Sequence, residues 1–218
     1  MKKLAILLTV LALLGLGFAG PAVAAPKKVK AKPFVLDLTA DNSGQVKAAW
    51  ITHAGLPDAG KSNHALHLEK LSAAPAEEAL AGAKIFGVKG VQFNYADFTL
   101  EYDYFTEGFC GDTSPRIEVT VVDDVTLALT TYVFGCTAGT QTTNTQDPLW
   151  THVVLTGAEA DTPMPATGSA TIESIQIIFD AGTDVTVDIN FARLDNIQIL
   201  GFPPIGKPGN ARWYKTPK

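Results

Sequence analysis

Residues 98–105 read FTLEYDYF, and this stretch decides the fold class. The large apolar residues fall at positions 98, 100, 102 and 104, and Thr99, Glu101 and Asp103 separate them. A period of two places the apolar set on one face of a β-strand and the polar set on the other. A strand with one buried and one wet face is typical of antiparallel sheets.

Sequence patterns typical of β-strands extend through most of the chain. Short runs rich in Val, Ile, Thr and aromatic residues are separated by Gly, Pro, Asp and Asn, with no alternation of strands and helices. This pattern predicts an all-β protein, an antiparallel β-sandwich or barrel. We expect one weak helix at 76–80, a β-bulge near Arg193, and strands at 34–39, 45–51, 64–71, 84–91, 97–105, 116–122, 128–135, 150–156, 172–180 and 185–200.

The N-terminus has the order of a secretory signal peptide. Lys2 and Lys3 precede an uncharged apolar run from Leu4 to Phe18, and Ala22-Val23-Ala24 forms a small-x-small cleavage site. We expect cleavage after Ala24 and a secreted, extracellular or periplasmic protein. The apolar run is shorter than the roughly 20 residues of a spanning helix, so an integral membrane protein is not expected.

The rest of the chain divides by composition. Residues 25–33 are predicted to be a basic linker, 34–201 the β-sandwich domain, and 202–218 a basic tail rich in Pro and Gly. All 22 acidic residues lie between Asp37 and Asp195, together with seven basic residues, which gives this body a net charge of −15. Such a body repels nucleic acid and suits neutral sugars, basic partners or divalent cations, although a secreted surface that is simply solvated by acids is the favoured explanation.

The two cysteines are predicted to form a disulfide. Cys110 precedes the strand at 116–122, Cys136 ends the strand at 128–135, and Asp123-Asp124-Val125 joins the two strands as a hairpin turn. A turn centred on Asp123 and Asp124 makes opposing residue numbers sum to about 247, and those of the two cysteines sum to 246. Secretion favours oxidation, and neither zinc spacing nor a C-x-x-C motif is present.

Several motifs give the chain a family resemblance. They are the final strand LDNI at 194–197, an early Leu36-Asp37, and the segments CGDTSPRIEV at 110–119, YVFGC at 132–136, WTHV at 150–153 and SIQIIFD at 174–180. Together they resemble largely uncharacterised bacterial secreted domains of the carbohydrate-binding-module type. The resemblance implies a jelly-roll, galactose-binding-like fold and specifies the ligand hardly at all.

The same resemblance implies a structural calcium ion. Many such modules hold one between their first and last strands, which here points to Asp37 and Asp195 with backbone carbonyls near 61–63. Two carboxylates and several carbonyls suit the six to eight oxygens of calcium. The alternatives are a chelating turn at Asp180–Asp184 with Asp188, or hydrogen bonds at strand ends without a metal.

Catalytic signals are weak. Glu101 and Asp103 point from one face, as the carboxylates of jelly-roll glycanases do, but Phe105 occupies the next position on that face. His64 and His67 differ in parity and do not suit joint ligation. No nucleophile motif such as G-x-S-x-G is present, so an enzyme is not expected.

A binding surface is the favoured interpretation. We expect it on the concave face that carries Glu101, Asp103 and Arg116, with Trp50 and Trp150 as candidates for stacking on sugar rings, although core packing is an alternative role for either tryptophan. The predicted function is a non-catalytic secreted module for a neutral glycan. The alternatives are a structural or adhesive envelope protein without a specific small ligand and a glycan-active enzyme of unfamiliar design.

Overall fold

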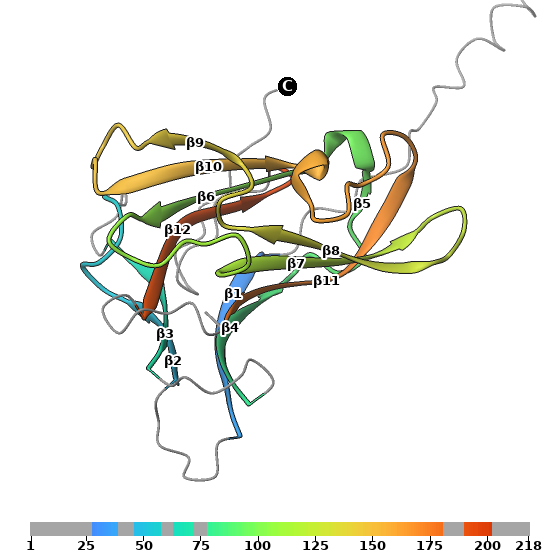
Figure 1. Ribbon diagram of the computed structural model, residues 1–218. Coiled ribbons are helices and arrows are strands. Elements are labelled where there is room, and N and C mark those ends of the chain that lie inside the picture. Colours follow the sequence, from blue (N-terminus) through green and yellow to red (C-terminus); the bar gives the residue numbers. More distant parts are fainter. Residues whose placement is uncertain (1–27, 39–45, 58–62, 72–77, 181–189, 202–218) are drawn as a thin grey trace, which may run out of the picture.

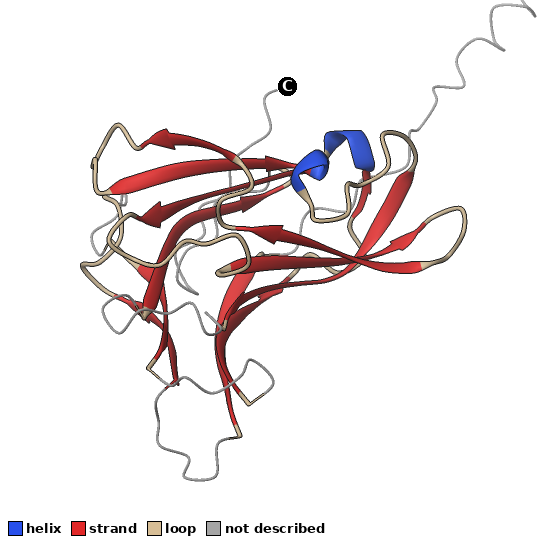
Figure 2. Cartoon of the chain, viewed as in Figure 1, coloured by secondary structure: helices blue, strands red, loops and turns tan. Residues whose placement is uncertain are grey.

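The computed structural model describes residues 28–38, 46–57, 63–71, 78–180 and 190–201. Strands make up 57% of this part of the chain, and its only helices are two short 3-10 helices, η1 (Tyr95–Asp97) and η2 (Gly157–Glu159) (Figure 2). The predicted signal peptide, the cleavage site after Ala24 and the tail from 202 lie outside the described residues. Within the described ranges, no helix is long and apolar enough to cross a membrane.

Two antiparallel sheets pack into a β-sandwich of jelly-roll type (Figure 1). The first, called the β7 sheet, has the order β1-β4-β11-β7-β8, and β5 pairs with one end of β11. Its strands are β1 (Lys30–Asp37), β4 (Ala79–Phe86), β5 (Gln92–Asn94), β7 (Arg116–Asp123), β8 (Leu129–Gly135) and β11 (Ser169–Phe179).

The second sheet, called the β6 sheet, has the order β2-β3-β12-β6-β10-β9. Its strands are β2 (Val46–Ile51), β3 (Ala65–Lys70), β6 (Thr99–Phe105), β9 (Thr140–Thr143), β10 (Trp150–Thr156) and β12 (Phe191–Ile199). The predicted fold class, an all-β antiparallel sandwich, is therefore confirmed.

The core lies between the sheets and follows the predicted alternation. Leu100 and Tyr102 from β6 are buried, and they belong to one apolar cluster with residues of β7 and β11 such as Val119 and Ile177. Burial also raises the pKa of the Tyr102 hydroxyl, which donates to the backbone carbonyl of Cys136. The polar residues of β6 consequently project from the outer face of the β6 sheet.

Several strand boundaries differ from the prediction. β1 begins at Lys30, inside the expected linker, and Pro33 is tolerated there because β1 is an edge strand and a proline cannot donate to a ladder. Ala79 and Leu80 belong to β4 rather than to a helix, because tertiary pairing with β1 overrides a weak helical preference. The short strands β5 and β9 were not predicted.

The β-bulge in the last strand exists but lies further along than expected. The register between β12 and β6 shifts between Asp195 and Gln198, and Asn196 has a positive φ of 48°. The shift returns Ile197 and Ile199 to the core while Asp195 faces outward. The bulge therefore determines which polar groups β12 presents on the outer face.

The predicted disulfide is confirmed, with the Cα atoms of Cys110 and Cys136 5.3 Å apart. The hairpin turn is longer than expected, since Val119 pairs with Tyr132 and their numbers sum to 251 rather than 247. The Asp123 carboxylate organises this turn by accepting from the backbone N–H groups of Val125 and Thr126. Residue numbers of paired residues sum to 251, whereas those of the two cysteines sum to 246. The segment 111–115, between Cys110 and β7, accommodates this difference.

Candidate functional site

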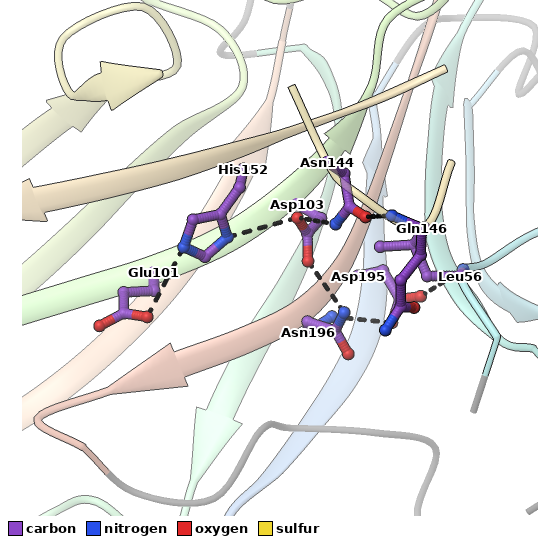
Figure 3. Close-up of polar contacts among 8 residues, drawn as sticks. All are labelled: Leu56, Glu101, Asp103, Asn144, Gln146, His152, Asp195 and Asn196. Atoms are coloured by element: carbon purple, nitrogen blue, oxygen red, sulfur yellow. Dashed lines mark hydrogen bonds and ion pairs between the residues drawn. The ribbon is translucent and has the colours of Figure 1, made fainter. Parts of the chain in front are cut away.

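The outer face of the β6 sheet gathers the polar residues of three neighbouring strands. β10 pairs with β6 so that His152 is opposite Asp103, and β12 pairs with β6 so that Asp195 is opposite the same residue. Glu101 precedes Asp103 by two residues on β6, so both side chains lie on the same face of the strand. Figure 3 shows His152, Asn144 and Asn196 in contact with Asp103, while Glu101 contacts His152 and Asp195 lies on the other side of Asn196.

Asp103 is the centre of this polar cluster and is only 2% exposed. Its Oδ1 accepts a hydrogen bond of 2.8 Å from the Asn144 side-chain amide, and its Oδ2 accepts one of 2.8 Å from the Asn196 amide. The His152 Nδ1 lies 3.3 Å from Oδ1. A buried carboxylate needs such partners, and here they also fix the orientation of three side chains from three segments.

Glu101 and His152 form the open end of the cluster. The two side chains are 34% and 35% exposed, and His152 Nε2 lies 3.8 Å from Glu101 Oε2. This distance is too long for a direct hydrogen bond, so both groups retain capacity for a ligand. The arrangement presents a carboxylate and an imidazole side by side above a buried anchor.

A loop from β2 to β3 covers the other end of the cluster. The Leu56 backbone N–H donates to Asp195 Oδ2 at 2.8 Å, and the Asn196 N–H donates to Oδ1 at 2.7 Å. A Cβ on Gly55 would lie 2.6 Å from Asp195 Oδ2 and 2.5 Å from the His64 carbonyl oxygen, so only glycine fits there. Asp195 thus anchors the loop to the sheet.

Next to this loop the outer face is apolar. Leu56, Ala65 and Trp150 are buried together, and Phe105 packs against them with its ring 5.5 Å from that of Trp150. Trp150 is only 3% exposed, so its ring is covered by the protein itself. Phe105 occupies the place of the third acid in a same-strand catalytic set, as the sequence indicated.

A row of stacked rings continues from Phe105 across the sheet. The Arg193 guanidinium lies 5.0 Å from the centre of the Phe105 ring and 4.9 Å from that of Phe191. The His67 ring lies 5.5 Å from Phe191. This row is adjacent to the polar cluster, because Arg193 precedes Asp195 by two residues on β12.

Glu69, on β3, contacts the His67 ring at the end of this row. Burial alone would raise the pKa of its carboxyl, but the neighbouring His67 and Lys47 outweigh that effect and lower it. His67 Nε2 lies 3.1 Å from Glu69 Oε2, and Lys47 Nζ lies 3.4 Å from Oε1. The carboxylate is therefore held charged and paired at the rim of the face.

Two predicted binding residues lie elsewhere. Trp50 points into the sandwich, where it packs against the core and its indole N–H donates to the Ala31 carbonyl at 3.1 Å. Arg116 belongs to β7 in the opposite sheet and pairs with Glu118 and Asp180. Placing Arg116 on one face with Glu101 and Asp103 was wrong, because sequence parity assigns a residue to a face of its strand but not to a sheet.

The predicted calcium ligands are in different sheets. Asp37 ends β1 in the β7 sheet, and Asp195 lies in the β6 sheet with both carboxylate oxygens accepting backbone N–H groups. Over the described ranges, no group of three or more His, Cys, Asp or Glu side chains is arranged to hold a metal. Residues 58–62 and 181–189, which include Lys61 and all of the alternative acidic turn except Asp180, fall outside those ranges. Calcium therefore stays a prediction.

His152, Asn144 and Asn196 are the site residues that the sequence did not reveal. His152 is 49 positions from Asp103, and only the register between β10 and β6 brings them together. Asn196 reaches Asp103 because of the bulge that follows Asp195. The one available signal was the parity of His152 relative to the core residues Val153 and Leu155.

Comparisons with known proteins yield structural similarity only. No protein-family model matches the chain, and no curated protein matches it. A family 30 carbohydrate-binding module aligns with a TM-score of 0.45 and 12% identity, covering 85% of this chain and 90% of its own. A family 11 carbohydrate-binding module from Clostridium thermocellum, solved with a β-1,3-1,4-mixed-linked tetrasaccharide, aligns with a TM-score of 0.40 and 10% identity, covering 87% and 92%.

A third solved structure aligns with a lower TM-score and covers less of this chain. The CBM27-1 module from Caldicellulosiruptor saccharolyticus, solved in complex with mannohexaose, aligns with a TM-score of 0.28 and 16% identity, covering 76% of this chain and 95% of its own. All three of these solved structures are carbohydrate-binding modules. At these identities the similarity concerns the fold, and any function must be argued from the site.

Proposed function

We propose that this protein is a non-catalytic module that binds a predominantly neutral glycan on the outer face of the β6 sheet. The observation that carries the proposal is the open pair of Glu101 and His152, held above the buried carboxylate of Asp103. Sugar hydroxyls both donate and accept hydrogen bonds, and a carboxylate beside an imidazole offers them acceptors and a donor at fixed positions.

The fixed geometry favours recognition. Asp103 orients His152, Asn144 and Asn196 before any ligand arrives, so little side-chain freedom is lost on binding. The face is part of an extended sheet, which suits an extended polymer. The exposed carboxylate of Glu101 and the acidic body disfavour polyanions and nucleic acid.

The same geometry argues against hydrolysis. Glycoside hydrolysis uses two carboxyl groups flanking the scissile bond. Asp103 is buried and accepts hydrogen bonds from two amides, which leaves Glu101 as the exposed carboxylate of the cluster. Phe105, which follows on the same face, packs against Trp150 and carries no proton-transfer group.

Secretion and calcium belong to the same proposal. The tripartite N-terminus supports export and cleavage after Ala24, and the mature protein should then begin with Ala25 in N-terminal sequencing. A calcium ion involving Asp37 and Asp195, with backbone carbonyls near 61–63, is proposed from the family resemblance of the sequence. It would stabilise the fold and take no part in binding chemistry.

A pull-down on insoluble and soluble glycans, followed by a reducing-sugar assay, tests the function. The panel should include neutral β-glucans, xylan and mannan. We expect retention on at least one neutral polymer and no release of reducing ends. Release of reducing ends that disappears in Glu101→Gln would instead identify an enzyme. No retention on any glycan would favour the structural or adhesive role.

A further inference from the structure

Arg193 has no carboxylate partner among the residues that the structure describes, although the protein is rich in acids. Its guanidinium carbon lies over the rings of both Phe105 and Phe191, and its Nε is buried without a hydrogen-bond partner. The residue as a whole is only partly buried. Among the described residues no carboxylate lies within ion-pair distance of Arg193, although the body carries a net charge of −15.

Other basic residues of the body are engaged differently. Lys47 pairs with Glu69, Lys89 with Glu173, and Arg116 with Glu118 and Asp180. Lys84, which lies over the Phe34 ring on the opposite sheet, is exposed to water. Arg193 therefore combines partial burial with the absence of a carboxylate partner among the described residues.

The stacking leaves the donors of Arg193 unused. Aromatic rings interact with the faces of a guanidinium, whereas its N–H groups lie in its plane and require acceptors at the edge. Two rings that hold the plane in place preorganise a fork of donors, which matches the two oxygens of a carboxylate.

The neighbouring acids of the face cannot supply that carboxylate without losing their own partners. Glu69 is engaged by His67 and Lys47, and Asp103 by Asn144 and Asn196. Asp195 accepts the backbone N–H groups of Leu56 and Asn196. None of these described acids therefore supplies an acceptor for Arg193 without giving up a partner of its own.

We infer that Arg193 binds a carboxylate of a uronic-acid unit in the glycan, an inference that rests on the proposed function. Arg193 and Asp195 are two residues apart on β12, about 7 Å along a strand, so one ligand reaches both Arg193 and the polar cluster. Glu101 and the acidic body oppose a dense polyanion. The fitting ligand is a neutral polymer that carries isolated carboxylates.

One polymer at three carboxylate densities tests this inference. Neutral β-glucan and mannan would each be used untreated, lightly oxidised at the primary alcohols to give isolated uronic acids, and fully oxidised. Affinity would be measured by isothermal titration calorimetry at low and high salt. We expect light oxidation to strengthen binding about tenfold in a salt-dependent way, and full oxidation to abolish it.

Two variants and one control assign the effect to Arg193. Arg193→Gln should lose the gain, so that it binds untreated and lightly oxidised polymer with equal affinity. Arg193→Lys, which retains the charge and the stem, should keep part of the gain and guards against a folding defect in the glutamine variant. Lys84→Gln removes one exposed positive charge from the opposite sheet and should change nothing.

The outcomes separate this inference from the proposed function. Equal binding of untreated and lightly oxidised polymers would overturn the inference and leave glycan binding intact. A gain that persists in Arg193→Gln, or that Lys84→Gln also removes, would overturn it too. No binding of any polymer by the wild-type protein would overturn the proposed function together with the inference.

Discussion

Asp103 shows at the residue scale how a single buried carboxylate organises a surface. Removing it would leave the amides of Asn144 and Asn196 without their acceptor in a largely dehydrated position. Leaving buried polar groups unpaired costs more than the net value of the hydrogen bonds themselves. Stability and recognition consequently depend on the same side chain.

We expect Asp103→Ala to lower the free energy of unfolding by about 3 kcal/mol, because its partners lose a buried acceptor. Chemical denaturation measures the change. Glu107→Ala removes an exposed carboxylate from the segment just after β6 and should stay within about 0.5 kcal/mol of wild type. An Asp103→Ala protein as stable as Glu107→Ala would contradict this role.

The close packing around Gly55 leads to a second prediction at the residue scale. A Cβ there would meet the Asp195 carboxylate and the His64 carbonyl at under 3 Å, so Gly55→Ala must displace the loop from Asp195. We expect a loss of roughly 2 kcal/mol, in the range of overpacking. Gly90→Ala is a useful comparison for open space, although its positive φ adds strain of its own. Denaturation curves that superimpose on wild type for Gly55→Ala would refute the close contact.

At the scale of elements, pairing register decides what periodicity leaves open. The alternation in residues 98–105 correctly placed Leu100 and Tyr102 in the core, since one strand suffices for that inference. It did not reveal that Asp103, on the polar face, is buried, because that burial depends on residues of other segments. The partner of a strand is a tertiary choice, which is why Arg116 was assigned to the wrong sheet and His152 was not grouped with Asp103. The bulge at Asn196 likewise depends on pairing with β6, and its position was displaced in the prediction.

The disulfide stabilises the β7–β8 hairpin at its open end. Closing a loop between residues 26 apart removes chain entropy from the unfolded state worth about 3.5 kcal/mol. We expect a Cys110→Ser/Cys136→Ser double variant to lose a comparable free energy of unfolding in denaturant titration. Reduction of the wild-type protein should reproduce the loss, and a variant of unchanged stability would show that the cross-link contributes nothing.

The pairing of β2 with β3 predicts a specific dependence on pH. His67 and Lys47 lower the folded-state pKa of Glu69, so its contribution is present above the unfolded pKa and is lost as the pH falls through the folded value. Thermal melts from about pH 5 downward should therefore show a shallower decline for Glu69→Gln than for wild type. Parallel curves for the two proteins would count against the pairing.

For the whole molecule, the two sheets differ in the use of their outer faces. The β7 sheet pairs Arg116 with Glu118 and Asp180, and these charges are satisfied within the protein. The β6 sheet leaves Glu101 and His152 open, and the Arg193 fork lacks an acceptor among the described residues. This asymmetry favours one binding face on the sandwich.

Calcium is a whole-molecule prediction because Asp37 and Asp195 belong to opposite sheets. An ion bound only by the folded state stabilises it by about 2.7 kcal/mol at a hundredfold excess over Kd. We expect EDTA to lower the melting temperature and added calcium to restore it. An unchanged melting temperature, with no metal detected by elemental analysis, would remove calcium from the account.

The central claim is that the outer face of the β6 sheet binds a neutral glycan, and NMR titration with a polysaccharide retained in the pull-down tests it most directly. We expect backbone and side-chain shifts to concentrate at Glu101, His152 and Arg193, and Glu101→Ala/His152→Ala to weaken them. Residues of the opposite face, such as Lys84 and Arg116, should not move. Shifts centred on the β7 sheet, or full affinity in the double variant, would contradict the claim.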